Sequence, residues 1–204
     1  MKTPLRYQVT EYDCGPTSLL NAVSFLFERE EIPPEVVRNI MLYSLDTFGT
    51  DGVSGKSGTS HTAMLFLSHW LDGFGKTGRL AIRSDYLTGR DVNLGADSRI
   101  VSALRRGGAA VVRLDLEGWH YVLLTGIEGD GVLVFDPYDP AESFPAEDVT
   151  VVQGGQYNRI VPRSRFETQE LHPYGLGPYE TREAVLLFNT AVELTEENTV
   201  EYII

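Results

Sequence analysis

The sequence predicts an α+β fold in which N-terminal helices pack on a mostly antiparallel sheet. Three stretches within the first 75 residues carry apolar residues at helical spacing. The later part of the chain instead contains short apolar runs, two of them joined by a hairpin signal. Helices followed by a run of strands are typical of this fold class.

The first helix is expected directly after Cys14, with Pro16 tolerated in its first turn. Its apolar stripe consists of Leu19, Leu20, Val23, Leu26 and Phe27. A second helix is expected in IPPEVVRNIMLYSL after the prolines, and a third within residues 58–75, where Thr59 or Ser60 can cap the start. The connection DTFGTDGVSGKSGTS is longer than most loops in compact domains, so we place it near the active cleft.

Strand character returns after the third helix. The segments are RLAIRS, AAVVRLDL, WHYVLLTGI, VLVFDP, YNRIVPRSRF and EAVLLFN, with a short helix at residues 97–106 after the first. WHYVLLTGI and VLVFDP flank EGDG, a strong hairpin signal. Pro162 should confine its segment to a sheet edge or a bulge, because proline cannot donate to the ladder.

The chain has 204 residues, 42 % of them apolar, which suits one domain with a sizeable core. We expect that core within residues 5–140, with residues 145–204 completing or flanking the sheet, or covering the cleft. A single cysteine and no apolar run long enough to span a bilayer suggest a soluble, cytoplasmic protein. The net charge of −12 argues against nucleic acid and membranes as partners, and the oligomeric state stays open.

Cys14 has two candidate partners for chemistry. At a helix start, unpaired N–H groups and the helix dipole favour a thiolate, although a lone cysteine is often only a packing residue. His120 lies near the start of one predicted strand, and Asp136 lies at the end of the next. An odd-numbered hairpin loop centred on Gly129 would place Asp136 opposite Val122, diagonal to His120. An even-numbered loop would turn Asp136 to the other face.

Gln8 can complete this set as a donor to an oxyanion. Acyl transfer through a thiol needs N–H groups directed at the tetrahedral intermediate, and the Gln8 amide and the Cys14 backbone N–H could supply two. No metal or cofactor is expected. His61 and His69 lie about two helical turns apart, but no further ligand completes a metal set, so structural roles are favoured.

These residues resemble the motifs of the bacteriocin-processing, double-glycine-leader cysteine peptidases of the papain-like clan. The matching segments are Gln8, DCGP at 13–16, GWHYVLL at 118–124 and DP at 136–137. The resemblance implies a stand-alone papain-like fold with Cys14 as nucleophile, His120 as general base and acid, Asp136 as its orienting group and Gln8 in the oxyanion hole. The enlarged stretch from about residue 44 to 97, and the lack of exporter segments, leave the substrate undefined.

The expected function is that of a thiol hydrolase, a cysteine peptidase cleaving a peptide or isopeptide bond in a peptide or protein through an acyl-enzyme. Two alternatives stay open. The same site could transfer the acyl group to an amine, because the sequence does not show how well water is excluded. The cleft could also hold a peptide without turnover.

Overall fold

The helices come first in the chain and the strands follow. The computed structural model describes residues 1–49, 52–138, 146 and 148–193. The N-terminal helices are α1 (Cys14–Leu26), the 3-10 turn η1 (Arg29–Glu31), α2 (Pro34–Ser44) and α3 (His61–Gly75). Helix α1 begins at Cys14, and Ser60 caps α3 by accepting a 3.1 Å hydrogen bond from the Ala63 backbone N–H.

All the strands of the described residues belong to one antiparallel sheet. They are β1 (Ile82–Thr88), β2 (Ala109–Asp115), β3 (Trp119–Glu128), β4 (Gly131–Phe135), β5 (Thr150–Val151), β6 (Arg159–Pro162) and β7 (Glu183–Asn189). Short helices connect them: η2 (Gly89–Asp91), α4 (Arg99–Arg105), α5 (Arg163–Phe166) and η3 (Tyr179–Thr181). The described chain is thus α+β with a seven-stranded sheet in the order β1-β7-β2-β3-β4-β6-β5.

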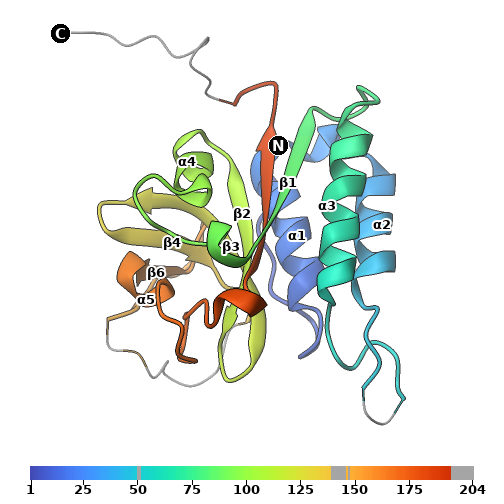
Figure 1. The fold of residues 1–204 in the computed structure, drawn as a ribbon. Coiled ribbons are helices and arrows are strands. Elements are labelled where there is room, and N and C mark those ends of the chain that lie inside the picture. The colour runs from blue at the N-terminus through green and yellow to red at the C-terminus, as the bar shows by residue number, and fades with distance from the viewer. Residues whose placement is uncertain (50–51, 139–145, 147, 194–204) are drawn as a thin grey trace, which may run out of the picture.

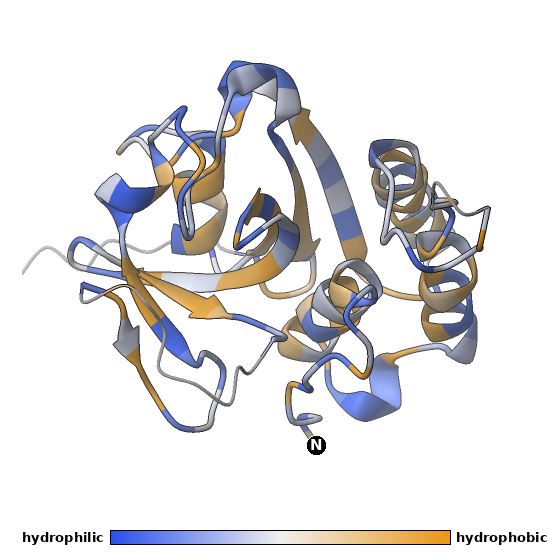
Figure 2. Ribbon diagram, turned by 90° about the horizontal axis from the view of Figure 1, so that it is seen from below, coloured by the Kyte–Doolittle hydropathy of each residue, from blue (hydrophilic) through white to orange (hydrophobic). Residues whose placement is uncertain are grey.

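The sheet is covered on both faces, and alternation along its strands divides the core in two. On β2, Ala109 and Val111 pack with the N-terminal helices, whereas Ala110 and Val112 pack with α4 and the C-terminal segment. Figure 1 shows α1, α2 and α3 gathered on one side of the sheet and α4 away from them. Figure 2 shows the central strands as strongly hydrophobic ribbon. This burial makes the sheet a rigid support for the residues at its ends.

The hairpin loop between β3 and β4 differs in length from the odd-numbered loop used in the prediction. Glu128 pairs with Gly131, so the loop has two residues rather than an odd number. The pairing then shifts between Leu124 and Gly126, which leaves Thr125 as an extra residue in a β-bulge. The extra residue in the bulge offsets the effect of the two-residue loop on the register, so Leu123 pairs with Phe135. One position further along, Asp136 lies opposite Val122. The predicted relationship is therefore reached by a different route.

The later segments also differ in part from the sequence prediction. The segment YNRIVPRSRF forms a strand only at β6 and continues as α5, with Pro162 as its N-cap residue. Strand β6 pairs with β4 along its whole length, whereas β5 pairs only with Arg159 and Ile160, so Pro162 lies at the strand end with β4 as its one described strand neighbour. The described part of residues 145–204 supplies β5, β6, α5 and β7, and β7 lies between β1 and β2. Residues 194–204 lie outside the described residues.

None of the described helices is both long and apolar enough to cross a bilayer.

Candidate active site

Cys14 is fixed at the start of α1 by the loop that precedes it. The Asp13 carboxylate accepts hydrogen bonds from the backbone N–H groups of Val9 at 3.0 Å and Thr10 at 2.6 Å, and from the Thr10 hydroxyl at 2.7 Å. Burial alone would raise the pKa of Asp13, but these hydrogen bonds outweigh it and lower that pKa. Asp13 thus closes the loop over residues 9–13, and Cys14 follows as a buried residue, 6 % exposed.

A buried hydrogen bond joins α1 to the strand that carries the histidine. The Ser18 hydroxyl donates to the Tyr121 carbonyl at 3.0 Å, one helical turn after Cys14 and one residue after His120. Because both groups are buried, the contact fixes the helix start against the beginning of β3.

His120 contacts both of its predicted partners. Its Nε2 lies 2.8 Å from Asp136 Oδ1, and Cys14 lies close enough to raise the pKa of the imidazole. Since Nε2 is engaged by the carboxylate, Nδ1 is the ring atom left for the sulfur. Burial lowers the pKa of His120, but the hydrogen bonds and charges of Asp136 and Cys14 outweigh burial and raise it to about 10. The imidazolium form of His120 is therefore favoured beside the Cys14 sulfur at neutral pH.

Asp136 is itself held by residues outside the predicted set. The Tyr174 hydroxyl donates to Oδ2 at 2.7 Å, and the Tyr138 backbone N–H donates to Oδ1 at 2.9 Å. Asn158 accepts from the Asp136 backbone N–H and donates to its carbonyl, both at 2.8 Å. With 1 % of its surface exposed, Asp136 is fixed at the end of β4 rather than open to solvent at the rim.

Tyr174 adopts a backbone conformation that is rare for a bulky residue. Its φ is 67°, in the left-handed region, and its side chain is fully buried. Burial, together with the charge and hydrogen bond of Asp136, raises the pKa of the phenol far above its ordinary value, so Tyr174 stays a donor. Sequence reasoning missed both Tyr174 and Asn158, because neither belongs to a motif and both lie in the C-terminal segment.

Gln8 lies near this site, but its amide contacts a different group. Its backbone N–H donates to the Pro137 carbonyl at 2.9 Å, which joins the N-terminal segment to the turn after Asp136. Its side-chain Nε2 donates to the Thr10 carbonyl at 2.8 Å, and Oε1 is buried without a hydrogen-bond partner. The structure therefore brings Cys14, His120 and Asp136 together, and the oxyanion role of Gln8 stays a prediction. The first turn of α1 leaves the Cys14 backbone N–H free for such a role.

Two cavities adjoin these residues on different sides. One of about 310 Å³ contains Cys14 and is lined by residues 57–61 before and at the start of α3, and by Arg113, Trp119 and Tyr121. The other, about 270 Å³, lies between residues 7–11 and the turn at Pro137 and Tyr138. The sequence favours a structural role for His61, but this residue lines the first cavity. Only a carboxylate partner, recognised in the sequence, could have indicated that position in advance.

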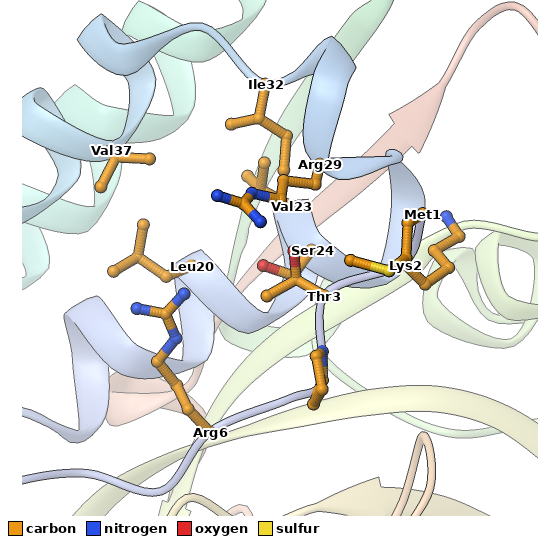
Figure 3. Close-up of a pocket in the computed structure, with 11 residues that line it drawn as sticks. Met1, Lys2, Thr3, Arg6, Leu20, Val23, Ser24, Arg29, Ile32 and Val37 are labelled. Atoms are coloured by element: carbon orange, nitrogen blue, oxygen red, sulfur yellow. The ribbon is translucent and has the colours of Figure 1, made fainter.

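A larger cavity of about 480 Å³ lies apart from the thiol. Figure 3 shows it between the N-terminal segment, α1 and α2, with the guanidinium groups of Arg6 and Arg29 beside Leu20 and Val37. None of Cys14, His120 and Asp136 lines it. Size alone therefore does not identify the site where chemistry is expected.

The comparisons with known proteins leave the geometry as the basis for assigning a function. No protein-family model matches this chain, and a search of curated proteins finds no matching sequence. What characterises the site is a cysteine at a helix start whose partner imidazole is held by a buried carboxylate.

Proposed function

We propose that this protein is a thiol hydrolase, a cysteine peptidase of the papain-like kind that cleaves a peptide or isopeptide bond through an acyl-enzyme on Cys14. The observation that carries the proposal is the chain of side-chain contacts from Cys14 to His120 to Asp136. The order of motifs around Gln8, Cys14, His120 and Asp136 supports it, because the papain-like cysteine peptidases use the same order.

In the acylation step, the proton of Cys14 resides on His120 and the thiolate attacks the carbonyl carbon of the substrate. The carbonyl oxygen becomes an oxyanion, for which the Cys14 backbone N–H is a donor and the Gln8 amide would be a second after turning from Thr10. As the intermediate collapses, the C–N bond breaks and the His120 imidazolium donates its proton to the leaving amine. Asp136 keeps the ring oriented throughout.

In the deacylation step, His120 is neutral and accepts a proton from water while the water oxygen attacks the thioester carbon. Collapse of the second tetrahedral intermediate breaks the C–S bond. The product carboxylic acid leaves, and the thiolate and imidazolium are restored. No redox or metal step is needed for this cycle.

The test is cleavage of a complex peptide mixture by the purified chain, with new termini identified by mass spectrometry. The protein should generate a reproducible set of new termini, and the Cys14→Ala variant should generate none. Brief incubation followed by acid quench should show a mass increase on the wild-type chain that hydroxylamine removes, as expected for a thioester. Equal cleavage by wild type and Cys14→Ala would overturn the proposal.

The same assay separates the alternatives. If an added amine such as glycinamide is incorporated in preference to water, the site is an acyltransferase. If no peptide is cleaved and Cys14 reacts with iodoacetamide at pH 6 no faster than a free thiol, the cleft only binds its ligand.

A further inference from the structure

The cavity beside Cys14 is lined by cationic and neutral groups in a strongly acidic chain. Apart from the Cys14 thiol and the Tyr121 phenol, its charged or ionisable lining residues are Arg113 and His61, and no carboxylate is among its described lining residues. Hydroxyl groups contribute the rest of its polar surface. The lining residues are Cys14, Thr47, Ser57, Gly58, Thr59, Ser60, His61, Arg113, Trp119 and Tyr121. In a chain with a net charge of −12, a cavity without an acidic lining residue is a distinct feature, and the nearest carboxylate among its contacts, Glu183, lies behind Arg113 and His61.

Arg113 is held rigidly but keeps hydrogen-bonding capacity. The residue is 8 % exposed, its Nη2 donates to the Thr181 carbonyl at 2.7 Å, and its guanidinium lies 4.3 Å from the Trp119 ring centre. Its Nε is buried and has no hydrogen-bond partner. A guanidinium has five N–H groups, so several remain for a ligand.

Glu183 fixes this arrangement from behind without using up the guanidinium. It is 1 % exposed, and its carboxylate accepts hydrogen bonds from the Tyr121 hydroxyl and, at 2.7 Å, from the Tyr86 hydroxyl. The His61 Nδ1 lies 2.9 Å from the same carboxylate. Arg113 Nε comes only to 3.6 Å, a charge contact rather than a hydrogen bond. Glu183 is therefore a positioning residue for Arg113 and His61.

A second unsatisfied group lies in the same cavity. The Thr59 hydroxyl oxygen is buried without a hydrogen-bond partner. It packs against Gly15, where a Cβ would come within 2.3 Å of it, so it sits directly against the start of α1. Buried polar groups are rarely left unpaired, and unpaired donors around one cavity indicate that an acceptor enters it.

We propose that this cavity is a specificity subsite for a carboxylate group next to the bond that Cys14 attacks, with Arg113 as the recognising residue and Thr59 as an additional donor. The inference rests on the proposed function for the identity of the substrate as a peptide. The carboxylate would come from an Asp or Glu side chain or from the free C-terminus of that peptide. Arg113 suits either source, because its planar guanidinium matches the geometry of a carboxylate.

The first experiment depends only on the thiol and not on peptide cleavage. Iodoacetate and iodoacetamide alkylate a thiolate by the same displacement, in which sulfur attacks the CH₂ carbon and iodide leaves, but only iodoacetate carries a carboxylate. Because Cys14 is the only cysteine, the mass of the whole chain reports its modification. The quantity to compare is the rate constant for iodoacetate divided by that for iodoacetamide. This ratio should be about tenfold lower in Arg113→Gln than in wild type, because the variant loses a hydrogen bond made by a charged group.

Two further variants keep this test decisive. Arg79→Gln removes the same charge from an exposed residue paired with Glu35 and should leave the ratio unchanged. Thr59→Val removes one donor with no change of charge and should lower the ratio a few-fold, which provides a readout if Arg113→Gln does not fold. An unchanged ratio in folded Arg113→Gln, or in Thr59→Val if the arginine variant does not fold, would overturn the subsite.

The second experiment identifies the source of the carboxylate. Cleaved peptides are resynthesised with Glu or Gln at each position near the scissile bond, and with a free or amidated C-terminus. A preference at one position that Arg113→Gln removes assigns a side chain, whereas loss on amidation assigns the terminus. Cleavage without preference for either would contradict the subsite and leave the peptidase intact. A carboxylate-dependent alkylation ratio with no peptide cleaved would keep the subsite and contradict the peptidase.

Discussion

Tyr174 donates its hydroxyl to Asp136 at 2.7 Å, although the two residues are 38 positions apart in the chain. The bond occupies Oδ2, while His120 and the Tyr138 backbone N–H occupy Oδ1. The carboxylate can therefore rotate only by breaking several hydrogen bonds at once. The orientation of the imidazole thus depends on a residue of the C-terminal segment.

Replacing Tyr174 with Phe removes this donor and leaves part of a buried carboxylate unsatisfied. We expect the free energy of unfolding to fall by about 1–3 kcal/mol, and the rate of Cys14 alkylation by iodoacetamide at pH 6 to fall as well. Urea denaturation and whole-protein mass spectrometry measure the two effects. Tyr43→Phe, at an exposed position on α2, is the matched control and should change neither. A Tyr174→Phe protein equal to wild type in both would contradict the positioning role.

Replacing Asp136 with Asn should shift the pH dependence of the site. In wild type the pKa of His120 is raised to about 10, so reactions that need the imidazolium should decline only near that pH. Without the carboxylate, the pKa should move down toward its ordinary value of about 6.5. The basic limb of kcat/KM should therefore appear at lower pH in the variant. A basic limb that does not move would mean that Asp136 has little influence on His120.

The raised pKa of His120 also predicts how stability varies with pH. The folded state holds this proton more tightly than the unfolded chain, so the stabilisation is complete below about pH 6.5, the ordinary value for histidine. It should decrease as the pH rises from there to about 10, where folded His120 loses its proton. Urea denaturation at several pH values should thus show a steeper loss of stability for wild type than for His120→Gln within this window. Parallel curves would contradict the raised pKa.

The bulge at Thr125 makes a prediction about deletions. Because Thr125 is the unpaired residue, removing it should leave Leu124 opposite Val134 and keep Asp136 on the face of His120. Cys14 should then remain reactive toward iodoacetamide within a few-fold of wild type. Deleting Val122 instead should turn His120 to the other face and remove that reactivity. Circular dichroism of both deletions identifies folded protein, and loss of reactivity in a folded Thr125 deletion would contradict this account.

Local patterns were sufficient for much of the fold. The start of α1 at Cys14, the cap at Ser60 and the extent of β7 follow from prolines, capping residues and apolar spacing, which act over a few residues. The predicted pairing of Asp136 with Val122 was reached, but the odd-numbered loop assumed for it was wrong. The only sequence signal of the Thr125 bulge that corrects the parity is the adjacent Gly126, an isolated glycine within a strand pattern.

Local sequence patterns do not predict the residues that support the site. Tyr174, Asn158 and Glu183 act through contacts made by the packing of the C-terminal segment against the rest of the sheet. An isolated tyrosine, asparagine or glutamate has no characteristic spacing from its partner when tens of residues intervene. Sequence reasoning could identify the thiol, imidazole and carboxylate, but not the groups that orient them.

The position of β7 has a consequence for synthesis of the protein in the cell. It is the last strand to leave the ribosome among those described, yet it lies inside the sheet, between the edge strand β1 and β2. Until it emerges, β1 lacks its one strand neighbour among the described strands, and Glu183 is not yet present behind Arg113. A nascent chain therefore carries Cys14 well before β7 completes the proposed recognition pocket, which delays binding of its ligand until β7 has emerged.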